Sequence, residues 1–444
     1  MTNIQESIHT VPVSRVAFID TSSVYTYGDI LDLKEKNQET IDFLTGRNLV
    51  INGRARVEFA LLLSLLDGYA KAILFLPLDI DEKLHTKYYD EATIDYEIWM
   101  DGSELKYSTS MRNTDTKREE VSHTQWIIPT SGTTNIPKLV SHTFSSLTRT
   151  AKTNIDLGDK YRWGLAFDIY RFSGIQVFLQ SLLSGSTLII TQPTQSMSEM
   201  ITQLSDNKCN ALSATPSFWR KVLMTKASET LHFERITLGG EISDNNILKA
   251  LKQKFPQAKI VHIYASTEVG VGFSVTDEKE GFPLSFLNNS LNDMKMKIDD
   301  QNLLWIAPKD KNQKYLSKND MYDQEGYINT GDLVEVKEGR VYFLGRDSGA
   351  INVGGNKVQP EEVERILLNS ELLSEAYVYA LKNAMMGSLV CANVVLKDLS
   401  LDKKEAKTLL LKFCREHLEN FKVPAIIKFV DTIETTQSGK LKRI

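Results

Sequence analysis

Short apolar runs alternate with amphipathic stretches along the first part of the chain. Four of these runs have the length and β-branched or aromatic content of buried strands: residues 15–20, 71–77, 186–191 and 259–265. Two stretches between them, residues 57–69 and 173–185, carry apolar residues at helical spacing. Strands that alternate with helices predict α/β layers around largely parallel sheets.

The pattern changes after about residue 280, where shorter strand-like runs separated by polar turns predict antiparallel β structure. These runs cover residues 294–300, 303–308 and 333–345. A second change comes at residues 345–355, where glycines interrupt the pattern.

The last hundred or so residues form a separate pattern of their own. Residues 360–370 begin with a proline and two glutamates, which is typical of a helix start. A strand at 391–398, an amphipathic helix at 402–421 and a strand at 425–431 follow. We therefore predict two domains: residues 1–347, with layered α/β subdomains plus a β-rich subdomain, and residues 348–444, a small α+β domain.

Composition narrows the class of protein. The 444 residues are 42% hydrophobic and 25% charged, which is normal for a soluble globular protein with more than one core. The formal net charge is −5, so the chain lacks the excess of basic residues that is typical of a nucleic-acid-binding protein. Cys209, Cys391 and Cys414 lie far apart and follow no metal-ligand spacing, so we expect reduced, buried thiols.

No segment has the pattern of a membrane span or a signal peptide. The first fifteen residues contain no apolar core. The most apolar stretch, residues 59–77, is interrupted by Asp67, Gly68 and Lys71, well short of the ~20 residues that a bilayer requires. We expect a cytoplasmic protein.

The decapeptide "PTSGTTNIPK", Pro129–Lys138, offers hydroxyl groups, a glycine and a lysine directly after an apolar run. It is not a P-loop, because the second glycine and the Lys-Ser/Thr pair of that motif are absent. Hydroxyls, a closely approachable backbone and a positive charge nevertheless suit an anion. An ordinary polar turn and a phosphate-binding loop both remain open from this segment alone.

Four later motifs decide between them. They are "IYASTEVG" (residues 263–270), "NTGDL" (329–333), "LGRDSGAINVGGNKVQPEEVE" (344–364) and "QSGKLKR" (437–443). Singly, each could be an ordinary surface or turn segment. In this order, from about residue 125 to the C-terminus, the series resembles the adenylate-forming superfamily of acyl- and aryl-CoA ligases, stand-alone adenylation domains and firefly luciferase.

The resemblance implies a two-step reaction. A carboxylate attacks the α-phosphate of ATP, with Mg²⁺ as cofactor, to give an acyl-adenylate and pyrophosphate. A thiol, from coenzyme A or from the phosphopantetheine of a carrier protein, then displaces AMP. The small C-terminal domain is implied to be mobile and to rotate about Ser348 between the two steps.

The resemblance also implies roles for individual residues. Lys440 would bridge the carboxylate and the α-phosphate, Thr267 would contact phosphate, and Glu268 would hold Mg²⁺. Asp332 would accept hydrogen bonds from the ribose, Arg346 would reach the ribose or a phosphate, and Tyr264 would stack on adenine. The remaining nucleotide-binding residues would be Thr130, Ser131, Gly132, Thr133, Thr134, Lys138, Gly240, Glu241, Ala265 and Ser266. Gly354 and Gly355 would line the path of the thiol.

The expected acyl pocket departs from the common family pattern. Many ligases have Pro-x-x-His-x-x-Gly where this chain has Asp168, Arg171 and Gly174. Arg171 could pair with a second polar group of the substrate or turn away and pair with Asp168. The expected pocket residues are Arg171, Phe172, Gly239, Gly270 and Val271. His142 and His262 are expected to be structural, with His262 near the pocket.

The implied substrate is a small or medium acid, aromatic or otherwise functionalised. An enzyme that loads a carrier protein, and a non-catalytic homologue that serves as a binding protein, are the alternatives. Retention of Lys440, Glu268 and Asp332 argues against the non-catalytic alternative. Monomer and homodimer both remain open.

Overall fold

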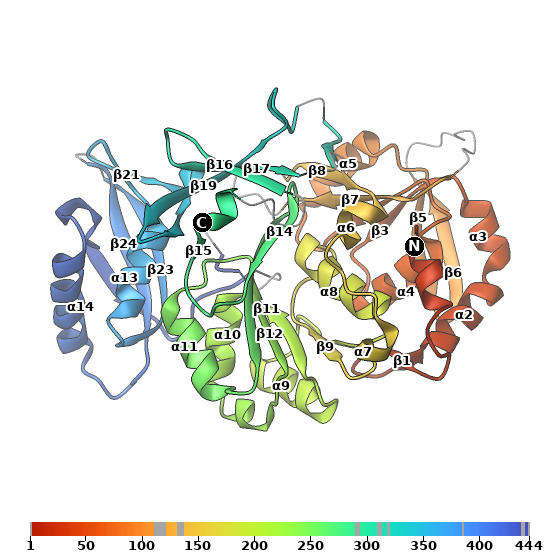
Figure 1. Cartoon of the computed structure of the whole chain (residues 1–444), viewed down its shortest axis with the longest axis horizontal. Coiled ribbons are helices and arrows are strands. Elements are labelled where there is room, and N and C mark those ends of the chain that lie inside the picture. The colour runs from red at the N-terminus through yellow and green to blue at the C-terminus, as the bar shows by residue number, and fades with distance from the viewer. Residues whose placement is uncertain are drawn as a thin grey trace.

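The computed structural model describes residues 2–110, 121–130, 137–288, 294–308, 313–317, 320–383, 386–436 and 440–442. The described residues form four sheets. In Figure 1 the N-terminal strands lie at the right, the C-terminal module lies at the left, and strands from the middle of the chain lie between them. The chain then returns from the module, so that its end lies at the junction with the rest of the molecule.

The first layer is a mixed seven-stranded sheet with the order β18-β8-β7-β4-β3-β5-β6. Its centre, β5-β3-β4-β7, is parallel. Its strands are β3 (Asn48–Asn52), β4 (Ala72–Leu76), β5 (Tyr96–Asp101), β6 (Glu104–Thr109), β7 (Gln125–Pro129), β8 (Leu139–His142) and β18 (Lys314–Tyr315).

The second layer is an eight-stranded sheet with the order β14-β13-β12-β11-β9-β10-β1-β2. It is parallel from β13 to β1, and antiparallel strands form both edges. Its strands are β1 (Val16–Ile19), β2 (Val24–Thr26), β9 (Arg162–Leu165), β10 (Thr187–Ile190), β11 (Ala211–Ala214), β12 (Arg235–Gly239), β13 (Lys259–Ser266) and β14 (Gly270–Val275). The predicted α/β layers with largely parallel strands are confirmed.

Helices cover these two sheets. They are α1 (Ile4–Ile8), α2 (Tyr27–Lys36), α3 (Gln38–Leu44), α4 (Arg56–Leu66), α5 (His85–Glu91), α6 (Phe144–Thr148), α7 (Ile155–Gly158), α8 (Phe172–Leu183), α9 (Met197–Asp206), α10 (Pro216–Met224) and α11 (Asn245–Lys254), with 3-10 turns η1 (Glu82–Leu84) and η2 (Lys226–Thr230). Helices α4 and α8 are apolar and mostly buried, because they contribute to one hydrophobic core together with strands of both sheets. This shared core fixes the two layers relative to each other.

The β-rich part predicted after residue 280 is a five-stranded sheet with the order β15-β20-β19-β17-β16. Every pairing in it is antiparallel, as the sequence predicts. Its elements are β15 (Phe282–Pro283), α12 (Ser285–Asn288), β16 (Met294–Ile298), β17 (Leu303–Pro308), β19 (Ile328–Lys337) and β20 (Arg340–Arg346).

The C-terminal module has a sheet and a hydrophobic core of its own. Helix α13 begins with Pro360 and carries Glu361 and Glu362 in its first turn, which places negative charge at the helix N-terminus. The elements are η3 (Asp347–Gly349), β21 (Ile351–Val353), β22 (Asn356–Val358), α13 (Pro360–Asn369), β23 (Leu373–Asn383), β24 (Gly387–Leu396), α14 (Lys403–His417), η4 (Asn420–Lys422) and β25 (Ile426–Phe429). The domain boundary predicted between residues 347 and 348 falls within η3 and stays a prediction.

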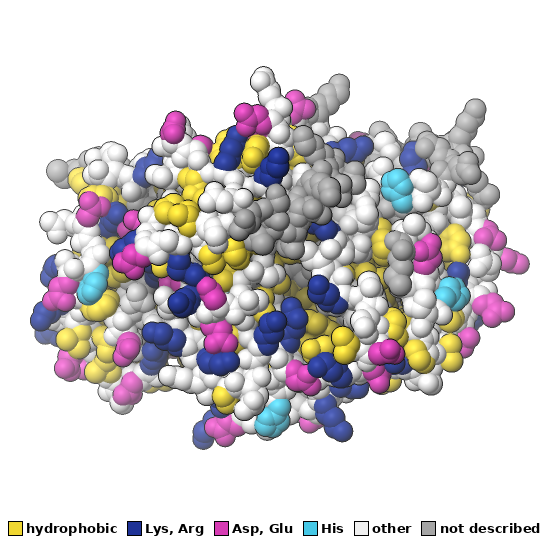
Figure 2. Space-filling view, in the orientation of Figure 1, with side chains coloured by type: hydrophobic (Ala, Val, Ile, Leu, Met, Phe, Trp, Pro, Cys, Tyr) yellow, Lys and Arg dark blue, Asp and Glu magenta, His cyan; other side chains and the backbone are white. Residues whose placement is uncertain are grey.

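The surface and the buried cysteines agree with what the composition leads us to expect. On the face in Figure 2, acidic and basic side chains are interspersed over most of the surface. Within the part of the chain that the structure describes, no helix combines the length and the apolar character needed to cross a membrane. Cys209, Cys391 and Cys414 are buried and unpaired, as expected.

Candidate active site

A cleft of about 860 Å³ opens where the carboxyl ends of parallel strands meet the C-terminal module. Asp79 follows β4, Thr130 follows β7 and Gly240 follows β12, and all three line the cleft. Ligands of open α/β sheets bind outside the carboxyl ends of the strands, because loops there converge on one crevice. The topology therefore indicates this cleft as the binding site.

The cleft gathers most of the residues that the sequence singles out. Those in its wall are Thr130, Arg171, Phe172, Gly240, Glu241, Tyr264, Ala265, Ser266, Thr267, Glu268, Asp332, Arg346 and Lys440. His262 also lines it, as expected. Ser131, Gly132, Thr133 and Thr134 lie outside the described residues.

The two ends of the expected phosphate loop are held together by the backbone. Thr130 N donates to Lys138 O at 2.8 Å, and Lys138 N donates to the hydroxyl of Thr130 at 3.0 Å. Strands β7 and β8 continue this pairing with Pro129 opposite Leu139. The ammonium of Lys138 lies 4.6 Å from the centroid of the Tyr315 ring rather than in the cleft wall.

Asp332 is the centre of a polar cluster in the cleft. Its Oδ2 accepts a 2.6 Å hydrogen bond from the Tyr264 hydroxyl, and its Oδ1 lies 3.1 Å from Arg346 Nε. Register explains the ion pair, because Asp332 on β19 lies directly opposite Arg346 on β20. A carboxylate has about four lone-pair sites, so Asp332 retains capacity to accept hydrogen bonds from ribose hydroxyls.

The ring of Tyr264 belongs to an aromatic stack. It lies nearly parallel to Phe273, at 5.3 Å between centroids, and to Phe343, at 5.2 Å. Burial, followed by the negative charge of Asp332, raises the pKa of Tyr264 well above its usual value, so the hydroxyl stays protonated and donates. Phe343 was not identified from the sequence, and stacking of adenine on Tyr264 stays a prediction.

Glu268 lies in the turn between β13 and β14, in the cleft wall. Its negative charge contributes to raising the pKa of Arg346 and the pKa of Tyr315. Among the described residues, no group of three or more His, Cys, Asp or Glu is placed to hold a metal ion. Magnesium at phosphate sites is usually held by one or two carboxylates together with the phosphates, and Glu268 fits that arrangement.

His142 and His262 are accounted for by the fold. His142 is fully buried next to Phe172, and burial lowers its pKa to about 3, so its ring is neutral. The Nε2 of His262 is 2.9 Å from the carbonyl of Lys279. Both histidines thus have structural environments, as the sequence leads us to expect.

Lys440 enters the cleft from the end of the chain. A Cβ on Gly240 would lie 3.0 Å from Lys440 Cε, so the lysine stem passes directly over that glycine. Burial lowers the pKa of Lys440, Arg346 and Arg171 lower it further, and Glu241 and Asp332 oppose them. The lysine therefore belongs to the same electrostatic cluster as Arg346 and Asp332.

Arg171 lines the cleft and pairs with carboxylates of the protein. Its Nη2 forms a 2.6 Å ion pair with Asp79, and its Nε is 3.9 Å from Asp168. Its Nη1 is 3.3 Å from the carbonyl of Thr130, at the start of the expected phosphate loop. Asp79 was not singled out from the sequence, although its position two residues after an apolar strand-like run was a usable signal.

The other predicted residues lie outside the cleft wall. Gly239 ends β12, and Gly270 and Val271 begin β14, with the carbonyl of Val271 accepting from Arg149 at 2.7 Å. Gly354 and Gly355 form the exposed turn between β21 and β22. Their expected place on the thiol path stays a prediction.

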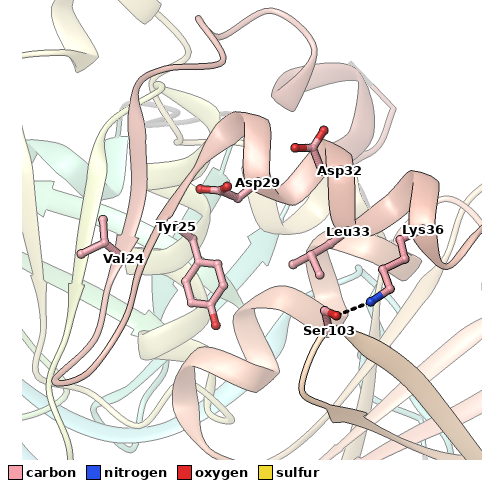
Figure 3. Close-up of a pocket in the computed structure, with 7 residues that line it drawn as sticks. All are labelled: Val24, Tyr25, Asp29, Asp32, Leu33, Lys36 and Ser103. Atoms are coloured by element: carbon pink, nitrogen blue, oxygen red, sulfur yellow. Dashed lines mark hydrogen bonds between the residues drawn. The ribbon is translucent and has the colours of Figure 1, made fainter.

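A smaller hollow of about 340 Å³ lies on the outer side of α2 (Figure 3). Its wall consists of Val24, Tyr25, Asp29, Asp32, Leu33, Lys36 and Ser103. The ammonium of Lys36 bonds to Ser103 across one end. It shares no residue with the large cleft.

Comparison with known proteins gives one consistent result. The family described as AMP-binding enzyme matches residues 65–304, and the AMP-binding enzyme C-terminal domain matches residues 362–440. A 2-succinylbenzoate–CoA ligase of Listeria innocua is 26% identical over 353 residues, which cover 77% of this chain and 73% of the relative. The 2-succinylbenzoate–CoA ligase of Bacillus subtilis is 25% identical over 338 residues, covering 72% and 68%.

Solved structures share the fold over nearly the whole chain. o-Succinylbenzoate CoA synthetase (MenE) from Bacillus subtilis, in complex with its acyl-adenylate, superposes with a TM-score of 0.73 at 20% identity, covering 99% of this chain and 97% of that one. ATP-bound MatB from Rhodopseudomonas palustris gives a TM-score of 0.77 at 18% identity, covering 99% and 97%.

Proposed function

The chain belongs to the AMP-binding enzyme family, and we propose on that premise that it is an AMP-forming acid–thiol ligase. It activates a carboxylic acid with ATP and transfers the acyl group to coenzyme A. The observation that carries the proposal is the convergence of Lys440, Asp332, Arg346 and Glu268 in one cleft at the carboxyl ends of the strands. These residues come from separate parts of the chain, and the chemistry needs all of them together.

In the first step, a substrate carboxylate oxygen attacks the α-phosphorus of ATP. The new P–O bond forms as the bond to the β-phosphate breaks, and pyrophosphate leaves. Protonated Lys440 lies where it can donate to the oxygens on which negative charge develops. Asp332 and Arg346 would hold the ribose, and Thr267 would contact the phosphates. Glu268 would hold Mg²⁺, which would neutralise negative charge on the phosphates.

In the second step, the thiol of coenzyme A attacks the acyl carbonyl, and AMP departs with the electron pair of the C–O bond. We propose that residues 348–444 rotate about Ser348 between the steps. Two observations support this proposal: η3 joins the module to the rest, and Lys440 lines the cleft in this arrangement whereas the Gly354–Gly355 turn does not. The rotation would remove Lys440 from the cleft and bring the Gly354–Gly355 turn to it.

For the acid we propose a small or medium aromatic or functionalised acid, with 2-succinylbenzoate as the first candidate from the relatives. Arg171 supports a substrate with a second polar group, since its guanidinium lines the cleft. Its ion pair with Asp79 would have to open or be shared for such contact. We also propose a cytoplasmic location, which the buried, unpaired cysteines support.

Pyrophosphate release tests the proposal. The purified chain is assayed with ATP, Mg²⁺ and a panel that includes 2-succinylbenzoate, benzoate, succinate, aliphatic acids and amino acids. We expect acid-dependent release, and thioester formation with coenzyme A. Lys440→Ala should reduce release by about 10²–10³-fold, the loss typical of removing one group that stabilises developing charge.

Each contrary result has a definite meaning. Thioester formation only with a phosphopantetheinylated carrier protein would identify the carrier as the acceptor instead of coenzyme A. Release that persists undiminished in Lys440→Ala would refute the role of the lysine. No release with any acid would refute the ligase and favour a binding protein.

A further inference from the structure

The carboxylate of Glu241 bridges the large part of the molecule and the end of the chain. Its Oε2 accepts a hydrogen bond from Ser217 N at 3.0 Å, and its Oε1 accepts one from Leu441 N at 2.8 Å. Leu441 is the residue after Lys440. Glu241 thus contacts the backbone next to the lysine, although 200 positions separate it from Leu441.

We propose that Glu241 is a positioning residue for Lys440, and that it holds the lysine in place only during adenylation. The inference rests on the proposed ligase function and deepens it. The sequence led us to expect nucleotide contact from Glu241. In the structure both of its carboxylate oxygens instead accept from main-chain N–H groups of the protein.

The large part of the molecule fixes the carboxylate in its orientation. Ser217 is the second residue of α10, so its N–H group has no hydrogen-bond partner within the helix. The Oε2 atom of Glu241 accepts the hydrogen bond from this group. The helix N-terminus also favours a negative charge there. Glu241 follows Gly240, whose lack of a side chain leaves room for the Lys440 stem. One short segment therefore both admits the lysine stem and anchors its backbone.

Main-chain hydrogen bonds also hold the segment around Lys440. Within the described residues, Lys440 O accepts from Thr436 N at 2.7 Å, and Lys442 N donates to Glu434 O at 3.1 Å. These two bonds join residues within the same segment. Lys221 of α10 bonds to the carbonyl of Ile433 at 3.2 Å, and the Glu241 bond reaches the residue directly after Lys440. A hydrogen bond to a charged group is among the stronger ones, which suits a contact that must hold a catalytic side chain.

Amide hydrogen exchange on the full chain tests the anchor without any substrate. In Glu241→Ala, the C-terminal peptide that contains Leu441 should exchange faster, while peptides of α13 and β23 remain unchanged. Glu434→Ala is the matched control. It removes an exposed carboxylate that pairs with Lys442 at 3.2 Å but leaves the Glu241 bond intact, and its exchange should match the wild type. Unchanged exchange in Glu241→Ala would overturn the proposal.

The half-reactions test the function of the anchor. With 2-succinylbenzoate as the acid, Glu241→Ala should slow ATP–pyrophosphate exchange roughly tenfold, as expected for losing one hydrogen bond to a charged group. Transfer to coenzyme A from synthetic 2-succinylbenzoyl-adenylate should keep the wild-type rate. Equal loss in both half-reactions would indicate a general structural defect and overturn the proposal.

The pH dependence of the ATP–pyrophosphate exchange rate distinguishes a positioning role of Glu241 from a packing role. Besides burial, the charged groups that shift the pKa of Lys440 are Arg346 and Arg171, which lower it, and Glu241 and Asp332, which raise it. Glu241→Gln keeps an acceptor for Leu441 N and should recover part of the exchange rate. It also removes a negative charge that favours the protonated lysine, so the alkaline limb of the profile should move to lower pH. An unmoved limb would contradict the proposal.

The two proposals fail in different ways. If the wild type releases no pyrophosphate with any acid, the ligase function fails, and the hydrogen-exchange comparison still decides whether Glu241 anchors the tail. If the wild type is active but Glu241→Ala equals Glu434→Ala in both measurements, the anchor fails and the ligase function stands.

Discussion

Gly240 offers a sharp test of how closely Lys440 approaches the large domain. Its φ is +81°, a left-handed backbone in which an alanine costs about 1–2 kcal/mol. The added Cβ would lie 3.0 Å from Lys440 Cε and 3.7 Å from Thr215 Cγ2. The second distance is an ordinary contact. The first is tighter than usual and pushes the lysine stem away by a few tenths of an ångström.

Two effects of Gly240→Ala follow. Backbone strain should lower the melting temperature by about 2–8 °C, from about 2–4 °C per kcal/mol for a large domain. Displacement of the lysine should slow adenylation by about tenfold, less than the ~10²-fold that a full 1 Å misplacement can cost. The assay is ATP–pyrophosphate exchange, with thioester formation from a supplied adenylate measured beside it.

Gly239→Ala is the matched control. Gly239 has no left-handed backbone, and its added Cβ would meet only the Ile263 carbonyl at 3.5 Å, an ordinary contact. The resemblance implies a place for Gly239 in the acyl pocket, but in the structure it lies outside the cleft wall, so we expect nearly wild-type stability and exchange. Equal losses in the two variants would refute the reasoning. So would a Gly240→Ala enzyme whose only change is a higher KM for ATP, because alanine would then touch the nucleotide and not the lysine.

Three further predictions follow from the cleft and the core. Burial and Arg346 lower the pKa of Lys440, so adenylation that needs the protonated amine should be lost as pH rises through that lowered pKa. In Lys440→Arg the rate of adenylation should stay constant to higher pH, because arginine stays protonated. Asp332→Asn removes the charge that pairs with Arg346 and should raise the KM for ATP about tenfold in steady-state kinetics, with stability nearly unchanged. Asp67 is fully buried and accepts hydrogen bonds from Ile4 N at 2.7 Å and Trp126 Nε1 at 2.8 Å. Asp67→Ala should therefore lower the free energy of unfolding, measured in urea, by about 2–3 kcal/mol, and a decrease below about 0.5 kcal/mol would contradict this account.

Local sequence signals were sufficient where one segment determines its own structure. The run at 259–265 becomes β13, and the proline and glutamates at 360–362 begin α13. The structure also brings described residues of separate motifs, such as Glu268, Asp332 and Lys440, into the wall of one cleft. Periodicity and helix-start chemistry are properties of neighbouring residues, so a single sequence carries them.

Pairings between distant segments could not be predicted in the same way. Strand β23, Leu373–Asn383, was not identified, since its apolar run ends in charged and polar residues. Its strand character depends on pairing with β24 along nearly its whole length. The contact of Arg171 with Asp79 and that of Glu241 with Leu441 were likewise missed, because these partners are 92 and 200 positions apart. Such contacts depend on how the layers are stacked.

The Asp332–Arg346 pair has a mechanical consequence. Arg346 is the last residue of β20, and η3 follows it directly, so the ion pair clamps the strand end from which the proposed rotation starts. The ion pair therefore ties the residue before η3 to β19, and the proposed rotation would begin after that residue. A ligand that draws Arg346 or Asp332 toward itself would change the stiffness of the joint. Ligand binding in the cleft and the proposed rotation of residues 348–444 would then be coupled through the side chains of Asp332 and Arg346.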